Sequence, residues 1–92
     1  MKIVKAGLAG SLESNDCLVG VYPVDEDGVQ VAVESIVLAQ FGGQIEAVAR
    51  ETLASLGVAA VRAHIQDKGA LECTLRARIE AAVGRAQGGG DA

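Results

Sequence analysis

Residues 45–66, IEAVARETLASLGVAAVRAHIQ, decide how this chain folds, because the spacing of their apolar side chains changes once within them. Before Gly57, apolar and small residues recur three and four positions apart, as they do along one face of a helix. That stripe consists of Ile45, Val48, Ala49, Thr52, Leu53 and Leu56. After Gly57, apolar residues alternate with Arg62, His64 and Gln66, which is the period of a strand with one buried face. The sequence therefore predicts a helix that stops at a glycine and leads into a strand.

Two runs upstream of this segment, residues 17–24 and 29–35, alternate in the same way as the strand. An acidic turn, Asp25–Gly28, joins them and ends in Asp-Gly. Because alternating runs on either side of such a turn are typical of a β-hairpin, we expect these two strands to pair with each other. Residues 2–9 carry small apolar side chains broken by glycine, and they predict only a weak strand or an extended arm.

A second helical stripe follows the last strand, and Asp67 precedes it at a position suited to a helix cap. The stripe consists of Leu71, Leu75, Ile79, Ala82, Val83 and Ala86. We expect two helices, near 41–56 and 70–86, and their apolar stripes need the face of a sheet to pack against. Leu53 and Leu75 should lie in the core between the two layers. The expected sheet strands are 17–24, 29–35 and 60–66. We therefore predict the α+β class, a two-layer sandwich in which a small mixed, mostly antiparallel sheet carries two amphipathic helices on one face. The last strand should run parallel to the strand before the first helix.

The length of the chain limits its organisation. At 92 residues it is one domain, and we expect residues 1–87 to form it and residues 88–92 to be a flexible, Gly-rich tail. A chain of this size buries about 60–65% of its unfolded surface, so it holds one modest core and no cleft between domains. No apolar run reaches the ~18 residues of a membrane span, and the start of the chain does not have the pattern of a signal peptide. We expect a cytoplasmic protein that binds no membrane.

The charge of the chain is unevenly distributed. Residues 6–49 contain no Lys or Arg but carry seven carboxylates: Glu13, Asp16, Asp25, Glu26, Asp27, Glu34 and Glu46. An acidic stretch of this length disfavours binding to nucleic acid, because phosphates would be repelled. It favours a partner with a basic surface, although acidic residues serve as often only to keep a protein soluble.

No set of residues assembles a catalytic centre. The single histidine, His64, falls on the outward phase of a strand, where a solvated side chain is the usual outcome. Cys17 and Cys73 are far apart and have no histidine or cysteine nearby, which excludes a zinc site and favours small, buried, unreactive thiols. There is no glycine-rich phosphate loop with its lysine. The sequence predicts a protein that is not an enzyme and that binds no metal.

One polar segment stands apart, Gly10–Asp16, with the sequence GSLESND between two expected strands. Ser14 lies at the expected turn of this segment, flanked by Glu13 and Asp16. Such clusters are most often ordinary turns. The alternative is that Ser14 is exposed so that another protein can modify it, and the modifying protein must then supply the base.

Three segments resemble the acyl carrier protein of citrate lyase, its gamma subunit: GSLESND at 10–16, SIVLAQFG at 35–42 and DKGALECTLRAR at 67–78. The resemblance runs from about residue 1 to about residue 86. It implies that Ser14, rather than the nearby Ser11, carries a covalently bound 2'-(5''-phosphoribosyl)-3'-dephospho-CoA through a phosphodiester. The thiol of that arm would hold acetyl and citryl thioesters while citrate is cleaved to acetate and oxaloacetate.

The resemblance also implies partners. They are the alpha and beta subunits of citrate lyase and a holo-carrier synthase that installs the group, with Glu13 and Asp16 steering Ser14 to basic active-site mouths. The chain itself would be a carrier subunit without catalytic residues. Two alternatives stay open: the acyl carrier subunit of malonate decarboxylase, which uses the same kind of arm, and an unmodified structural adapter that only binds partner subunits.

Overall fold

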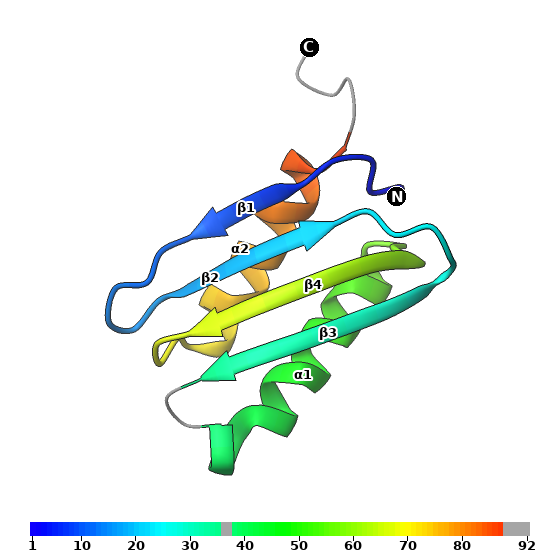
Figure 1. Cartoon of the computed structure of the whole chain (residues 1–92). Helices are drawn as coiled ribbons and strands as arrows, with labels where there is room; N and C mark the ends of the chain where they lie inside the picture. The colour runs from blue at the N-terminus through cyan, green and yellow to red at the C-terminus, as the bar shows by residue number, and fades with distance from the viewer. Residues whose placement is uncertain (36–37, 88–92) are drawn as a thin grey trace.

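A computed structural model describes residues 1–35 and 38–87, and the side chains of the first helix from residue 43 onward. The elements in chain order are β1 (Gly7–Gly10), β2 (Cys17–Tyr22), β3 (Gly28–Ser35), α1 (Leu38–Ser55), β4 (Ala60–Asp67) and α2 (Glu72–Arg85). The four strands form one mixed sheet, and both helices lie on the same face of it (Figure 1). The predicted α+β two-layer sandwich is confirmed. Both predicted helices exist, at Leu38–Ser55 instead of 41–56 and at Glu72–Arg85 instead of 70–86.

The order of the strands differs from the expected hairpin. The sheet has the order β1-β2-β4-β3, so β4 lies between the runs 17–24 and 29–35. It pairs antiparallel with β2, from Cys17↔Asp67 to Tyr22↔Arg62, and parallel with β3. The predicted pairing of those two runs is therefore wrong, whereas the parallel relation of the last strand to β3 is confirmed.

Burial explains this order. Val61, Ala63 and Ile65 of β4 are at most 1% exposed, whereas every second residue of β3 is exposed and the others are only half-buried. The two strands whose inward residues are fully buried, β2 and β4, take the central positions, and β3 takes an edge where one side of its backbone faces solvent. The segment between β2 and β3 is an open connection around the end of β4 and not a hairpin turn.

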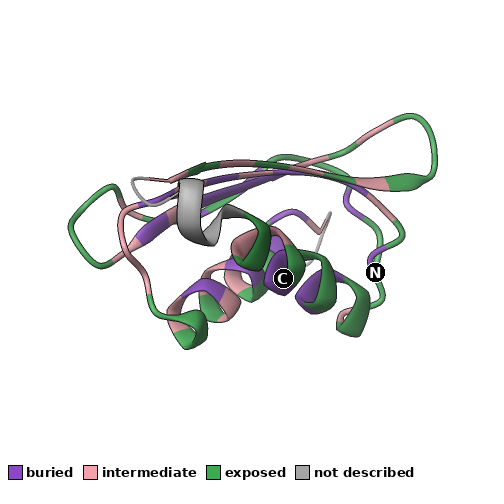
Figure 2. Ribbon diagram, turned by 90° about the horizontal axis from the view of Figure 1, so that it is seen from below, coloured by how far each residue is buried: buried purple, intermediate pink, exposed green. Residues whose placement is uncertain are grey.

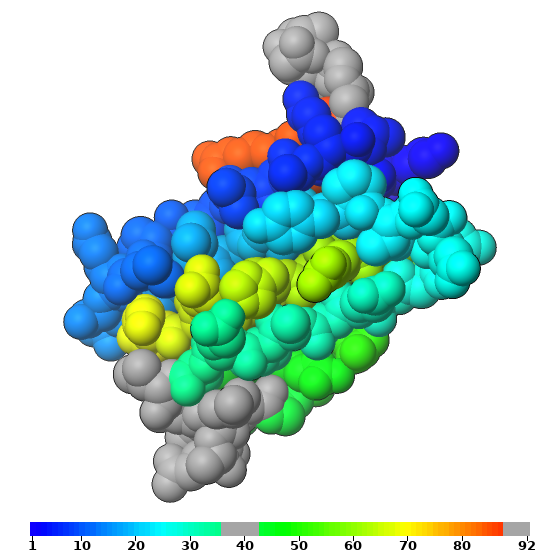
Figure 3. All heavy atoms as spheres, viewed as in Figure 1, coloured from blue at the N-terminus to red at the C-terminus, as the bar shows by residue number. Residues whose placement is uncertain are grey.

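The core lies between the sheet and the two helices, where the ribbon in Figure 2 is coloured as buried on the facing sides of both layers. Leu53 and Leu75, both predicted to be core residues, are 0% and 5% exposed. Leu71, predicted to belong to the same stripe, is instead 70% exposed, because it lies just before α2 and not within it. None of the described segments covers the opposite face of the sheet, where side chains of all four strands are visible (Figure 3).

The N-terminal arm and β1 are held against the end of α2. The backbone N–H groups of Val4 and Lys5 both donate to the carbonyl of Ala86. Gly7 is packed so closely on α2 that a Cβ placed there would lie 2.2 Å from the carbonyl oxygen of Ala82. The weak strand expected within 2–9 is thus a short edge strand, Gly7–Gly10, and it leads directly into the polar segment that contains Ser14.

Two predictions lie partly or wholly beyond these elements. The Gly-rich residues 88–92 are outside the described residues, and the extent of the single domain, 1–87, stays a prediction. Among the helices in the described part of the chain, none combines the length and the apolar character that crossing a membrane requires.

Candidate functional site

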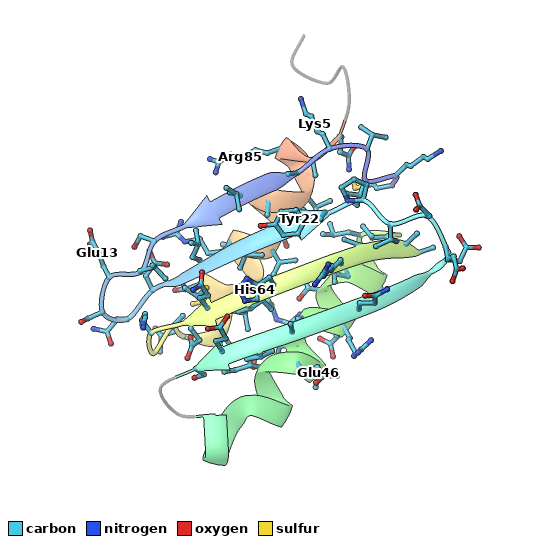
Figure 4. All side chains as sticks on the ribbon, viewed as in Figure 1. Lys5, Glu13, Tyr22, Glu46, His64 and Arg85 are labelled. Atoms are coloured by element: carbon cyan, nitrogen blue, oxygen red, sulfur yellow. The ribbon has the colours of Figure 1, made fainter. Side chains whose placement is uncertain are left out.

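Ser14 lies in the loop between β1 and β2, at the outer end of the sheet. Residues 12–15 are all exposed, and the backbone turns at Ser14 and Asn15. Glu13 projects from the tip of this loop, away from the body of the molecule (Figure 4). Within the described residues, no hydrogen bond or ion pair engages the Ser14 hydroxyl. The expectation of an exposed serine in a polar turn is therefore confirmed.

Asp16 holds the loop in place. Its carboxylate accepts hydrogen bonds from the Ser11 hydroxyl at 2.8 Å and from the backbone N–H of Cys17 at 2.7 Å. Arg78 of α2 adds two more, from Nε at 3.0 Å and Nη2 at 3.1 Å. These donors, Arg78 first and then Ser11, lower the pKa of Asp16 from 3.8 to about 2. The loop is thus tied to the second helix by a two-pronged arginine–carboxylate contact.

A second set of contacts ties the same loop to the turn between β4 and α2. The Asn15 N–H donates to the carbonyl of Lys68 at 2.8 Å, and the Lys68 N–H donates to the carbonyl of Asp16 at 2.9 Å. Asn15 adopts a positive φ of 67°, a conformation that asparagine tolerates better than most residues. The two residues that follow Ser14 are therefore fixed in place, because both are bonded to the β4–α2 turn.

Asp67 stabilises the β4–α2 turn through hydrogen bonds and does not cap the helix. Its carboxylate accepts from the N–H groups of Gly69 at 3.2 Å and Ala70 at 3.0 Å, and from the Ser35 hydroxyl at 2.8 Å. The residue at the N-cap position of α2 is Leu71, which supplies no side-chain hydrogen bond. The prediction that Asp67 caps the second helix is therefore wrong. The Asp67 carboxylate instead accepts hydrogen bonds from the turn that precedes the helix.

The two serines of the loop differ in their surroundings. Ser11 is half-buried, and its hydroxyl donates to Asp16 and accepts from the N–H of Glu13 at 3.2 Å. Its oxygen is thus occupied in holding the loop, while that of Ser14 faces solvent. Of the two acidic neighbours expected to steer partners, Asp16 is neutralised by Arg78. Glu13 is exposed and forms no ion pair with the described residues, so of the two carboxylates it is the one whose charge remains available to a partner.

The remaining candidates lie elsewhere. Cys17 is completely buried, and burial raises the pKa of its thiol to about 11. Cys73 is exposed on α2, so the expectation of two buried cysteines is wrong for it. His64 is half-buried on the outer face of the sheet, with its Nε2 against Oε2 of Glu34 (Figure 4). Over the described residues, no three His, Cys, Asp or Glu side chains are grouped closely enough to hold a metal ion.

Sequence reasoning did not find Arg78 as part of this site. It lies 62 positions from Asp16, and nothing in local periodicity joins the two. The fold and the loop together define a class of protein: a small α+β domain that presents an exposed serine hydroxyl on an anchored loop.

Comparison with known proteins specifies the class further. The family model described as malonate decarboxylase delta subunit, in the acyl carrier group, matches residues 4–86. The citrate lyase acyl carrier protein of Escherichia fergusonii is 58% identical over 94% of this chain and 89% of its own length. Those of Klebsiella pneumoniae and Clostridium perfringens are 54% and 52% identical, over 86% and 94% of this chain and 81% and 85% of their own. The chain belongs to the citrate lyase acyl carrier protein family.

Solved structures share the fold. A chain of a Pseudomonas malonate decarboxylase hetero-tetramer in complex with malonate superposes with a TM-score of 0.67, at 20% identity over 95% of this chain and 93% of that one. The homoserine kinase of Cytophaga hutchinsonii gives 0.55 at 13% identity, with 96% of this chain covering 36% of the kinase. At such low identities the likeness concerns the arrangement of strands and helices alone.

Proposed function

We propose that this chain is the acyl carrier subunit of a citrate lyase and that Ser14 is the residue to which its prosthetic group is attached. The observation that carries the proposal is the exposed Ser14 hydroxyl, engaged by no described residue, on a loop fixed at both ends of its turn. Relatives named citrate lyase acyl carrier protein, at 50–58% identity, support the assignment to that complex.

The group proposed is 2'-(5''-phosphoribosyl)-3'-dephospho-CoA, linked through a phosphodiester. The surroundings of Ser14 fit such a linkage, because an exposed hydroxyl can reach a phosphorus atom held by another protein. In that step the Ser14 Oγ–P bond forms, a leaving group departs from the phosphorus, and the hydroxyl proton goes to a base. The described residues place no base against Ser14, so a holo-carrier synthase has to supply one. When bound, the group supplies a thiol that holds the acetyl or citryl unit.

The chain's own residues act by holding the attachment point. The Asp16–Arg78 contact ties the loop to α2, and the backbone of Lys68 ties Asn15 and Asp16 to the β4–α2 turn. A covalent attachment makes each transfer between subunits intramolecular, which raises the effective concentration of the acyl unit to about millimolar. A rigid loop then limits the volume that the tethered end explores. The proposed partners are the alpha and beta subunits and the synthase, in a cytoplasmic complex.

A second function, carrier of malonate decarboxylase, has one observation in its favour. The family model that matches residues 4–86 takes its description from the delta subunit of that enzyme. The three relatives compared above point to citrate lyase at more than 50% identity, which favours the first proposal. An unmodified adapter is the third candidate, and nothing specific favours it.

Isolation of the native complex tests the proposal. The tagged chain should be recovered from its host with two larger subunits that together cleave citrate and leave malonate unchanged. A Ser14→Ala variant should be recovered with the same subunits but without citrate cleavage. Recovery of a malonate-decarboxylating complex would replace the first candidate by the second. Full citrate cleavage by the Ser14→Ala complex would support an adapter.

A further inference from the structure

An open groove of about 400 Å³ lies between the first half of α1 and the start of α2. Its walls are apolar: Ile45 and Val48 come from α1, and Leu71 and Leu75 come from the start of α2. Leu71 is 70% exposed although it is as apolar as its buried neighbours. Leu71 is thus an exposed apolar side chain that adjoins three further apolar side chains along one groove.

The groove ends beside the Ser14 loop. Its end is formed by Gly69 and Ala70, which belong to the β4–α2 turn. That turn is the one bonded to Asn15 and Asp16 through Lys68, and a Cβ placed on Gly69 would lie 3.7 Å from Oδ1 of Asn15. The loop and the turn lie at the same end of the sheet (Figure 1). A group attached to Ser14 therefore starts next to the mouth of the groove.

The polar atoms around the groove limit what fits. They belong to Gln44, Asp67 and Glu72, and no Lys or Arg is part of the described lining. Asp67 already accepts three hydrogen bonds from its own chain, so it contributes mainly a fixed negative charge. Phosphates would be repelled here, whereas a neutral chain of methylene and amide groups would meet apolar walls and a polar rim.

We propose that this groove receives the pantetheine part of the group on Ser14, with its thioester end between Val48 and Leu71. The inference rests on the proposed function, because it requires a modified Ser14. The phosphates and sugars of the group remain outside. Since the tether keeps the pantetheine at about millimolar effective concentration, weak contacts with four apolar side chains suffice to populate the bound state. The groove then shields the thioester from water between transfers.

Methyl NMR of the full-length chain tests the position of the arm. The chain is prepared with and without the synthase, and intact mass shows whether Ser14 is modified. Modification should shift the methyl signals of Ile45, Val48 and Leu75, while those of Val21, on β2, stay in place. If mass is added but only signals of the loop 11–16 shift, the inference is overturned. If no mass is added, the proposed function fails instead.

Hydrolysis of the acetyl thioester, to acetate and free thiol, gives a second readout that does not depend on the lyase subunits. Leu71→Ser should raise the rate of thioester hydrolysis on the isolated carrier roughly fivefold, since it removes the apolar contact of one leucine side chain. Leu8→Ser is the matched control, because Leu8 is also exposed, at 52%, but lies on β1. Equal rates in the two variants would overturn the inference, and because Leu71 is 70% exposed its replacement leaves the core intact.

Discussion

Four donors converge on the carboxylate of Asp16, from Ser11, Cys17 and Arg78, and together they set the shape of the loop that carries Ser14. The role of Asp16 is thus internal. Asp16 was expected to attract partners, but its carboxylate is paired with Arg78 of the second helix. The carboxylate of Glu13 remains exposed.

The stability of the chain should depend on the ionisation of Asp16. Its pKa is lowered from 3.8 to about 2, so the ionised form stabilises the folded state above 3.8. That contribution is lost as the pH falls from 3.8 toward about 2. In chemical denaturation, the free energy of unfolding of wild type should exceed that of Asp16→Asn by a constant amount near neutral pH. The difference should shrink across the acid window.

Arg78→Ala should weaken the same pH dependence, because Arg78 makes the largest contribution to the low pKa of Asp16 and the bonds from Ser11 and Cys17 remain. Arg62→Ala is a suitable control, since Arg62 is exposed and makes no ion pair with the described residues. A wild-type–Asp16→Asn difference that stays constant down to pH 2 would show that the Arg78 contact does not form in solution.

The two cysteines should behave oppositely toward thiol reagents. Cys73 is exposed and should react in the native protein, whereas Cys17 is buried, with its pKa raised to about 11, and should react only after unfolding. Cys17→Ser should cost about 1–3 kcal/mol of stability, because a hydroxyl is buried in place of a thiol.

Neither cysteine should carry the acyl group. Loss of acetylation in a folded double Cys→Ser variant would show that the carrier thiol is a cysteine.

Among the strands, position in the sheet follows burial and not nearness in the sequence. Alternation in 17–24 and 29–35 correctly predicted two strands with one apolar face each. It could not reveal that β4 would lie between them, because alternation reports which face is buried and not which strand is next. Residues 29–35 and 60–66 both alternate apolar and polar side chains, so the almost complete burial of Val61, Ala63 and Ile65 is visible only in the structure.

Close packing of β1 on α2 gives a prediction at the level of elements. Gly7→Ala would place a methyl group 2.2 Å from the carbonyl oxygen of Ala82 and should destabilise the fold by about 1–3 kcal/mol. Gly84→Ala, on α2, meets no atom within 4 Å and should stabilise it by up to about 1 kcal/mol, since alanine is the better helix former. Thermal unfolding of both variants provides the measurement. Similar effects of the two changes would mean that β1 does not pack on α2.

The whole molecule has its exposed serine, its acidic loop tip and its apolar groove at one end of the sheet. Sequence reasoning predicted the class of fold, the exposure of Ser14 and both helices, because each leaves a local pattern. It did not predict the Asp16–Arg78 contact or the groove. Both depend on how α2 is placed against distant parts of the chain, and residues such as Leu71, assigned to the core by spacing, show where periodicity stops being informative.

Docking should be sensitive to charge at this end. Glu13→Lys should slow modification by the synthase several-fold at low salt, an effect that added salt should diminish because exposed charges are screened. Asp27→Lys makes the same charge change in the connection between β2 and β3, at the opposite end of the sheet (Figure 1). It should have little effect on the rate. Equal slowing by both changes would indicate that overall charge matters and that the position of Glu13 does not.

Mass spectrometry of the chain from its native host tests the central claim, that Ser14 bears the group. Intact mass and fragment masses of wild type, Ser14→Ala and Ser11→Ala should show the added mass of phosphoribosyl-dephospho-CoA on the fragment that contains Ser14. The mass should be absent in Ser14→Ala and retained in Ser11→Ala. An added mass that persists in Ser14→Ala, or one that matches phosphopantetheine alone, would contradict the account.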